Sequence, residues 1–255
     1  MNLSLQLSEV HTASTVSIAG SKSETNRLLL LQALYPNIDL QNVSTSDDSE
    51  VMMKAIQTSE TVIDIHHAGT AMRFLTAYFA IQEGREVVLT GSARMKERPI
   101  QILVEAIQQL GADITYEEAV GFPPLRIKGK KLLNSKVSLQ ANVSSQYISA
   151  LLLISPKLEN GLQLTLEGEL TSVPYIQMTL DLLNHIGVKT KFDNNYIQVF
   201  PRTDNPEPTT HNDYRRIRLV ICVLFLFHHR VVESRHSNHT IQFQTKQLAR
   251  RQCFN

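Results

Sequence analysis

The chain has few cysteines, almost no net charge and no long apolar run, and each shortage excludes a class of protein. Two cysteines among 255 residues, Cys222 and Cys253, cannot build the disulfide framework of a small secreted domain. A net charge of +1 argues against a general nucleic-acid or membrane-surface binder, because both need a basic excess. The longest apolar run, Leu219–Phe227, is too short to span a bilayer. Residues 1–10 lack the charged start and apolar stretch of a signal peptide, so we expect a cytoplasmic protein. We also expect a monomer.

Glycine is missing from the end of the chain. All ten glycines lie at or before Gly187, although average usage of roughly 7% would put about five in the remainder. From Tyr214 onward the only acidic residue is Glu233, among many arginines. Such a segment lacks ordinary turn and surface chemistry. We predict that residues 203–255 form an aberrant tail, either a frameshifted end or a basic, loop-rich extension.

Familiar cofactor and metal motifs are also missing. The chain has no P-loop, no G-x-G-x-x-G and no C-x-x-C. His66 and His67 are adjacent, so in a strand they would point to opposite faces and make a poor metal pair. We therefore expect neither a metal ion nor an organic cofactor.

Two patterns recur in the rest of the chain. The first is an amphipathic helix, a capping glycine and a strand, in Ile102–Tyr116 and Met178–Phe192, with a looser copy in Val51–Ile65. The second is a hydroxyl-rich turn that opens an apolar helix, and it starts at Ser21, Ala68 and Asn142. Paired, the patterns predict three similar units of strands and helices. We expect one α/β domain over residues 21–202, with the apolar helices inside.

The hydroxyl-rich turns are where we expect chemistry. A helix amino terminus presents unpaired N–H groups and the positive end of a dipole, so it binds anions. Lys22, Arg27 and Arg73 lie in these turns, and the loop Thr90–Pro99 adds Arg94, Lys96 and Arg98. Cations at helix amino termini are locally unfavourable. A bound phosphate or carboxylate would explain them.

Each of these residues also has an interpretation that needs no ligand. Hydroxyl side chains serve as plain helix caps, which would account for Ser23, Thr70 and Ser144. Ion pairs with acidic neighbours would account for Arg27 and Arg73, and solvation would account for Lys22. A hydrogen bond to the backbone would account for Gln146. A capped helix start with a packed ring would account for Ser172 and Tyr175.

Five segments, taken in order, resemble the successive motifs of the 5-enolpyruvylshikimate-3-phosphate synthase family. They are GSKSETNR (Gly20–Arg27), AGTAMRFL (Ala68–Leu75), LTGSARMKERPI (Leu89–Ile100), NVSSQYISALL (Asn142–Leu152) and SVPYIQMTL (Ser172–Leu180). The related UDP-N-acetylglucosamine enolpyruvyltransferases normally carry a reactive cysteine in this half, whereas residues 1–221 contain none. One departure is His67, where the family often has Asn.

The resemblance implies a threefold repeat of βαβαββ-like units with buried helices. It also implies transfer of the enolpyruvyl group of phosphoenolpyruvate to shikimate 3-phosphate in aromatic amino-acid biosynthesis, without a metal or cofactor, at a site for which glyphosate competes. By match of motif, phosphoenolpyruvate would be contacted by Lys22, Gly69, Arg94 and Gln146. Shikimate 3-phosphate would be contacted by Ser23, Arg27, Ser144, Ser145, Ser172 and Tyr175. Thr70 and Arg73 would shape the turn, and Lys22 would be the catalytic residue of this half.

In that family the active site lies between two similar domains, and no motif of the second follows residue 201. Residues 1–20 would normally pack with that second domain. Since proton transfers in the reaction need positioned acid–base groups, we expect the chain alone to be inactive or nearly so. Two alternatives stay open: a non-catalytic phospholigand-binding remnant, and a truncated UDP-N-acetylglucosamine enolpyruvyltransferase.

Overall fold

The computed structural model describes residues 19–140, 144–170 and 172–202, together with four short strands outside these ranges. The helices are α1 (Lys22–Leu34), α2 (Asp47–Gln57), α3 (Gly69–Ala80), α4 (Ala93–Lys96), α5 (Gln101–Gln109), α6 (Ser145–Ile154), α7 (Val173–His185) and the 3₁₀ helix η1 (Ser155–Lys157). The strands of the described body are β2 (Asp39–Gln41), β3 (Val62–Asp64), β4 (Glu86–Thr90), β5 (Asp113–Tyr116), β6 (Leu125–Lys128), β7 (Lys136–Gln140), β8 (Leu162–Glu167), β9 (Thr190–Asp193) and β10 (Tyr196–Val199). The four short strands are β1 (Thr15–Ser17), β11 (Arg216–Arg218), β12 (Val231–Val232) and β13 (Thr240–Phe243).

Two four-stranded sheets have the same topology, which confirms the α/β repeat. Their strand orders are β3-β4-β6-β5 and β7-β8-β10-β9. In each sheet the first two strands run parallel, and the remaining pairs are antiparallel. Each sheet therefore belongs to one complete βαβαββ unit. In both units a glycine with positive φ follows the second long helix, Gly111 (φ 101°) after α5 and Gly187 (φ 88°) after α7, as the pattern predicts.

The first unit is only partly present among the described residues. It contains α1, β2 and α2, and β2 pairs in parallel with β11. The helix and strand predicted in Val51–Ile65 exist, but the strand, β3, opens the sheet of the next unit and does not close its own. The predicted helix and strand are therefore present, but the strand pairs with β4 and does not complete the first unit. Only residues 58–61 separate α2 from β3, which leaves no room for a hairpin.

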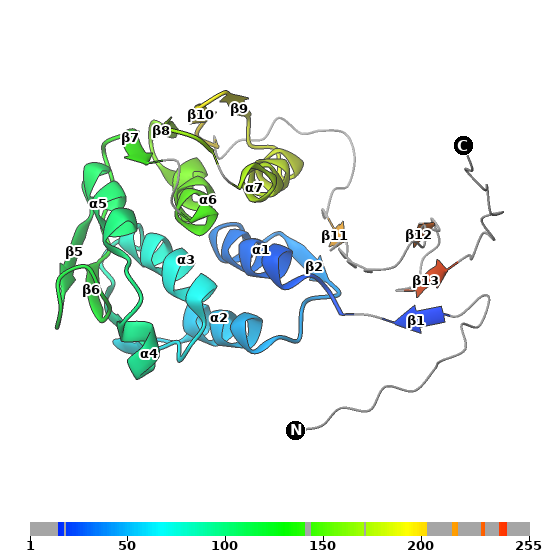
Figure 1. Cartoon of the computed structure of the whole chain (residues 1–255), viewed down its shortest axis with the longest axis horizontal. Helices are drawn as coiled ribbons and strands as arrows, with labels where there is room; N and C mark the ends of the chain where they lie inside the picture. Colours follow the sequence, from blue (N-terminus) through cyan, green and yellow to red (C-terminus); the bar gives the residue numbers. More distant parts are fainter. Residues whose placement is uncertain are drawn as a thin grey trace, which may run out of the picture.

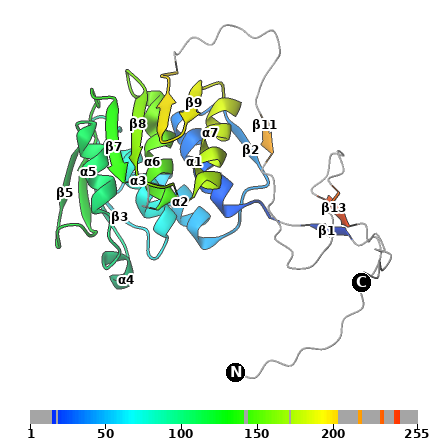
Figure 2. The same cartoon turned by 45° about the horizontal axis from the view of Figure 1, so that its top comes forward.

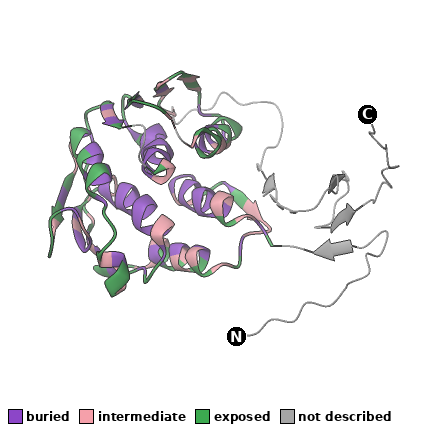
Figure 3. Cartoon of the chain, in the orientation of Figure 1, coloured by how far each residue is buried: buried purple, intermediate pink, exposed green. Residues whose placement is uncertain are grey.

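Three apolar helices, α1, α3 and α6, occupy the middle of the molecule, as the sequence predicts. Figure 1 shows them side by side, with α2, α5, α7 and the two sheets around them, and Figure 2 shows the strands β7 and β8 in front of them. Leu30, Phe74 and Leu151 have no exposed surface. The buried residues concentrate on these helices, whereas the outer helices bury one face (Figure 3).

The strands β1, β12 and β13 form a separate three-stranded sheet in which β1 pairs with β13. Most of residues 1–20 and 203–255 lie outside the described ranges. The predictions for the amino-terminal segment and for the aberrant tail therefore stay predictions. Within the described residues, no helix has the length and apolar character needed to cross a membrane.

Candidate active site

Side-chain hydrogen bonds join the first two turns of the central helices and of α7. Gln146 on α6 donates through Nε2 to Thr70 Oγ1 on α3, over 3.2 Å. Arg27 on α1 donates to Ser149 on α6 and to Thr179 on α7. The repeated turns therefore lie together at one end of the helix cluster, as the anion-site hypothesis requires.

Helix capping differs among these turns. Ser21 caps α1 by accepting from the N–H of Glu24, and Ser144 caps α6 by accepting from the N–H of Gln146. The residue at the cap position of α3 is Ala68, and Ser172 at the start of α7 makes no side-chain capping bond in the described structure. Ser23 and Thr70 lie inside their helices and are not caps. The ligand-free interpretation thus holds for Ser144 and fails for Ser23 and Thr70.

Arg27 is a buried cation held by neutral oxygens. Its side chain is 3% exposed, and it donates to Thr179 Oγ1 (2.8 Å), Ser149 Oγ (2.9 Å) and the Ser23 carbonyl (2.7 Å). Its guanidinium also lies over the rings of Phe74 (5.4 Å) and Tyr175 (5.9 Å). Burial lowers the pKa of Arg27 to about 10, so it is charged at neutral pH. Within the described residues it forms no ion pair, and a buried charge without a partner is costly.

Two further arginines, Arg73 and Arg98, have their guanidinium groups near Gly69, the first residue of α3. Arg73 is 9% exposed, donates to the Gly69 carbonyl (2.8 Å), and lies over the ring of Tyr147 (5.9 Å). Its Nε is buried without a hydrogen-bond partner among the described residues. Burial lowers the pKa of Arg73, Tyr147 opposes this in part, and the nearby charge of Arg98 adds to the lowering. Two like charges beside a helix amino terminus favour an anion.

Lys22, the first residue of α1, is an exposed cation near these helix starts. Its Nζ is 3.5 Å from Asp48 Oδ2 on α2, with the Lys22 side chain 48% exposed. A cavity of about 200 Å³ next to this pair is lined by Asp47, Asp48, Val51, Ile65, His66, His67 and Ala68. The ion pair with Asp48 thus keeps the Lys22 ammonium near the starts of α1 and α2, while about half of the side chain stays exposed.

The other predicted ligands have different surroundings. Ser145 and Gln146 are partly exposed in the first turn of α6, and Tyr175 is 47% exposed on α7. Arg94 is exposed on α4, and it makes no hydrogen bond or ion pair with another described residue. Arg98, on the same loop, reaches Gly69 and Arg73. Of the two arginines, the structure brings Arg98 to the cluster.

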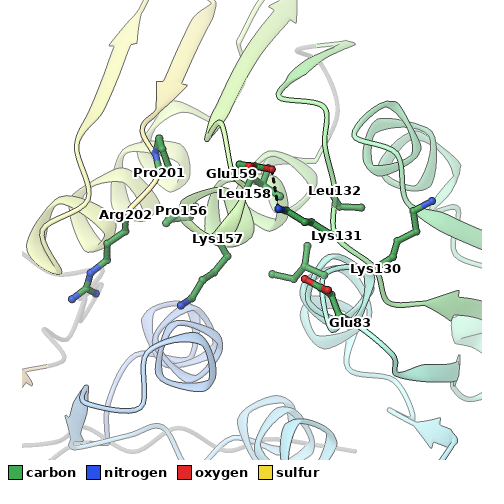
Figure 4. Close-up of a pocket in the computed structure, with 11 residues that line it drawn as sticks. Glu83, Lys130, Lys131, Leu132, Pro156, Lys157, Leu158, Glu159, Pro201 and Arg202 are labelled. Carbon is green, nitrogen blue, oxygen red and sulfur yellow. Dashed lines mark ion pairs between the residues drawn. The ribbon is translucent and has the colours of Figure 1, made fainter. Parts of the chain in front are cut away.

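A larger hollow lies at the opposite ends of the same helices. It has a volume of about 410 Å³ and is lined mainly by residues that follow α3, β6, α6 and β10. In Figure 4, Lys131 pairs with Glu159 (3.0 Å) and Lys130 points away from it. Lys157 and Arg202 are 4.2 and 4.5 Å from the ring centre of Tyr35. Three of these cations thus already contact a carboxylate or a ring of the protein, so we assign no ligand to this hollow.

Glu24 gives a pH-dependent prediction. Burial raises the pKa of its carboxyl, and the charge of Arg27 opposes this only in part. An acid with a raised folded-state pKa stabilises the fold most when protonated, and this contribution is lost as pH rises through the folded-state pKa. We expect Glu24→Gln to melt at a higher temperature than the parent near neutral pH. The difference should vanish below the ordinary value of 4.5.

Thermal melts of parent and variant across this pH range measure the effect. Glu50→Gln is the matched control, because Glu50 is an exposed carboxylate in the first turn of α2. It should bring no gain in melting temperature at any pH. Equal melting temperatures of Glu24→Gln and the parent near neutral pH would contradict the prediction.

Comparisons with known proteins agree with this architecture. A family model described as EPSP synthase (3-phosphoshikimate 1-carboxyvinyltransferase) matches residues 54–214, more than half of the chain. The chain belongs to the EPSP synthase family. A protein of this name from Bacteroides fragilis is 50% identical over 198 residues, which cover 77% of this chain and 48% of the relative. Another from Haemophilus ducreyi is 39% identical over 214 residues, covering 72% of this chain and 49% of the relative.

A solved structure supports the fold independently. EPSP synthase from Acinetobacter baumannii matches with a TM-score of 0.61 at 18% identity, over 76% of this chain and 49% of that one. The chain therefore spans about half the length of the curated relatives it matches. The family resemblance predicted from the five motifs is confirmed, whereas the roles of individual EPSP synthase site residues stay predictions.

Proposed function

We propose that this chain provides the half of 3-phosphoshikimate 1-carboxyvinyltransferase that binds shikimate 3-phosphate and phosphoenolpyruvate. The main support is Arg27, a buried cation without an ion-pair partner in the described residues, at a place where four helices begin or pass. Both proposed substrates are anions, and a fork of guanidinium N–H groups matches carboxylate and phosphate oxygens. The names of the relatives supply the substrates.

The proposed ligands divide into two groups. Shikimate 3-phosphate is bound by Arg27, Ser23, Ser144, Ser145, Ser172 and Tyr175, which lie on α1, α6 and α7 or at their starts. Phosphoenolpyruvate is bound near the start of α3 by Lys22, Gly69 and Gln146, with Arg73 behind them. We add Arg98 to this group in preference to Arg94, because Arg98 reaches Gly69.

In the proposed reaction the 5-hydroxyl of shikimate 3-phosphate loses its proton as its oxygen bonds to C2 of phosphoenolpyruvate, and C3 takes up a proton. Loss of phosphate from C2 and of a proton from C3 then restores the C2=C3 double bond, now in an enol ether. These proton transfers need placed acid–base groups, of which Lys22 is the one proposed here. We therefore propose that the described residues bind both substrates, and that turnover needs groups beyond them. The proposal also includes a cytoplasmic monomer, because phosphorylated substrates do not cross membranes unaided and all proposed ligands come from one chain.

Calorimetric titration of the purified chain tests this proposal. Shikimate 3-phosphate is expected to bind, with phosphoenolpyruvate or glyphosate binding in its presence. Shikimate without the phosphate and UDP-N-acetylglucosamine are the control ligands. No binding of shikimate 3-phosphate at millimolar concentration would overturn the proposal, and preference for the UDP-sugar would favour the related transferase. Growth of an aromatic auxotroph carrying this chain would reject the idea of a non-catalytic remnant.

Gly69→Ala gives a local test of the phosphoenolpyruvate group. A Cβ at this position would lie 2.5 Å from Arg98 Nη1 and 2.8 Å from Arg73 Nη1. Since both close atoms are the ends of flexible arginine side chains, they can shift and the fold should survive. We expect phosphoenolpyruvate binding to weaken about tenfold, the loss of roughly one charge-assisted hydrogen bond.

Titration of Gly69→Ala with each substrate checks this prediction. Shikimate 3-phosphate is the internal control, because its proposed ligands lie on other helices. Its affinity should stay within about twofold of the parent value. An unchanged affinity for phosphoenolpyruvate, or an equal loss for both ligands, would contradict the predicted placement.

A further inference from the structure

Two buried hydroxyl side chains lie behind Arg27, on different helices. Ser149 on α6 and Thr179 on α7 are both 0% exposed, and their oxygens are 3.0 Å apart. Thr179 Oγ1 accepts from Arg27 Nε, and Ser149 Oγ accepts from Arg27 Nη2. Because neither hydroxyl reaches the surface, neither can contact a ligand directly.

Only one arrangement of the Ser149 and Thr179 hydroxyl hydrogens forms all of these hydrogen bonds at once. Each hydroxyl has one hydrogen to donate. Thr179 donates its hydrogen to the Tyr175 carbonyl, over 2.9 Å. Ser149 must then donate to Thr179, and both oxygens present lone pairs to Arg27. Both hydroxyls then donate and accept, so together they form a rigid polar element inside the core.

This network fixes the plane of the guanidinium. A guanidinium has five N–H groups in a rigid fork. Three of them bond to Thr179, to Ser149 and to the carbonyl of Ser23 in the first turn of α1. Two N–H groups remain, one on each terminal nitrogen, and neither has a hydrogen-bond acceptor among the described residues. The same network ends at the carbonyl of Tyr175, another proposed ligand.

We propose that Ser149 and Thr179 are positioning residues that hold Arg27 in the orientation that binds shikimate 3-phosphate. This inference rests on the proposed function. Loss of the Thr179 hydroxyl leaves Arg27 Nε without its acceptor, and the guanidinium turns to find another. The two N–H groups meant for the ligand then lose their alignment, although the charge stays in place.

Thr179→Val and Thr179→Ser separate this role from a structural one. Valine keeps the shape of threonine and removes the hydroxyl, whereas serine keeps the hydroxyl and removes a buried methyl group. We expect Thr179→Val to weaken shikimate 3-phosphate binding about tenfold, and Thr179→Ser to stay within about twofold of the parent. If Thr179 served packing alone, Thr179→Ser would weaken binding more than Thr179→Val, because serine leaves a cavity where the methyl group was.

The experiment is calorimetric titration of the full chain, at a temperature where thermal melts show each variant to be folded. In an Arg27→Lys background, Thr179→Val should have little further effect, since both changes act on the same contact. Equal affinities of the valine and serine variants would overturn this inference and leave the proposed function standing. The same holds if the binding losses of Thr179→Val and Arg27→Lys add fully. A parent chain that does not bind shikimate 3-phosphate would overturn the proposed function and the inference with it.

Discussion

Replacing Arg27 by lysine is expected to weaken shikimate 3-phosphate binding by about 2–3 kcal/mol, roughly 30- to 150-fold. Lysine keeps the positive charge but lacks the planar guanidinium, three of whose five N–H groups bond to Ser23, Ser149 and Thr179. Its ammonium cannot satisfy these acceptors and also present two parallel donors to an anion. Calorimetric titration measures the loss, and the melting temperature of the variant shows whether it is folded.

Arg85→Lys is the matched control for this substitution. Arg85 follows α3, lies 4.8 Å from the ring centre of Phe79, and donates to the carbonyl of Thr58. The control therefore replaces another arginine that combines a ring contact with a backbone acceptor. Its affinity for shikimate 3-phosphate should equal that of the parent. If Arg27→Lys also binds like the parent, the charge alone matters and the fork has no role.

The sequence predicts the helix starts well because their signals are local. Ser21 and Ser144 precede apolar runs and cap helices in the structure. Lys22 and Arg27 could be singled out because cations in the first turns of a helix are unfavourable without an anion. The charge pattern therefore singles out an arginine that the structure buries, while its role in binding stays a prediction.

The loop Thr90–Pro99 shows that the sequence does not reveal which side chain of a loop reaches a neighbouring helix. It contains three cations, and its motif resemblance pointed to Arg94. In the structure the short helix α4 leaves Arg94 exposed, and the turn after it brings Arg98 to Gly69. Which side chain of a loop reaches a neighbouring helix depends on the path of the backbone, and no periodicity in the sequence encodes that path.

Ser149 and Thr179 were missed for a different reason. Both lie in helices that the sequence marks as apolar or amphipathic, and a single hydroxyl hardly changes that pattern. The available signal was a polar residue in a segment predicted to be buried, since such a group needs a partner. The pairing of β3 with β4 was not predicted either, because the repeat was recognised from its helices. A helix-and-strand pattern does not say which sheet the strand joins.

Replacing Leu151 by alanine is expected to lower the free energy of unfolding by about 2–5 kcal/mol, a large part of the roughly 5–15 kcal/mol that stabilises a typical domain. Leu151 has no exposed surface and lies on α6, which contacts α1, α3 and α7. Helices packed on several sides cannot close the cavity, and alanine is itself a good helix former, so the loss reflects packing alone. Urea denaturation measures it.

Leu133→Ala is the matched control for Leu151→Ala, because Leu133 is 65% exposed. It should change the free energy of unfolding by no more than about 0.5 kcal/mol. Shikimate 3-phosphate should raise the stability of both variants by the same increment, since that increment depends only on ligand concentration and affinity. Equal stabilities of the two variants would show that α6 is not the packed centre of the domain. A smaller ligand increment in Leu151→Ala would show that the core and the helix starts are coupled.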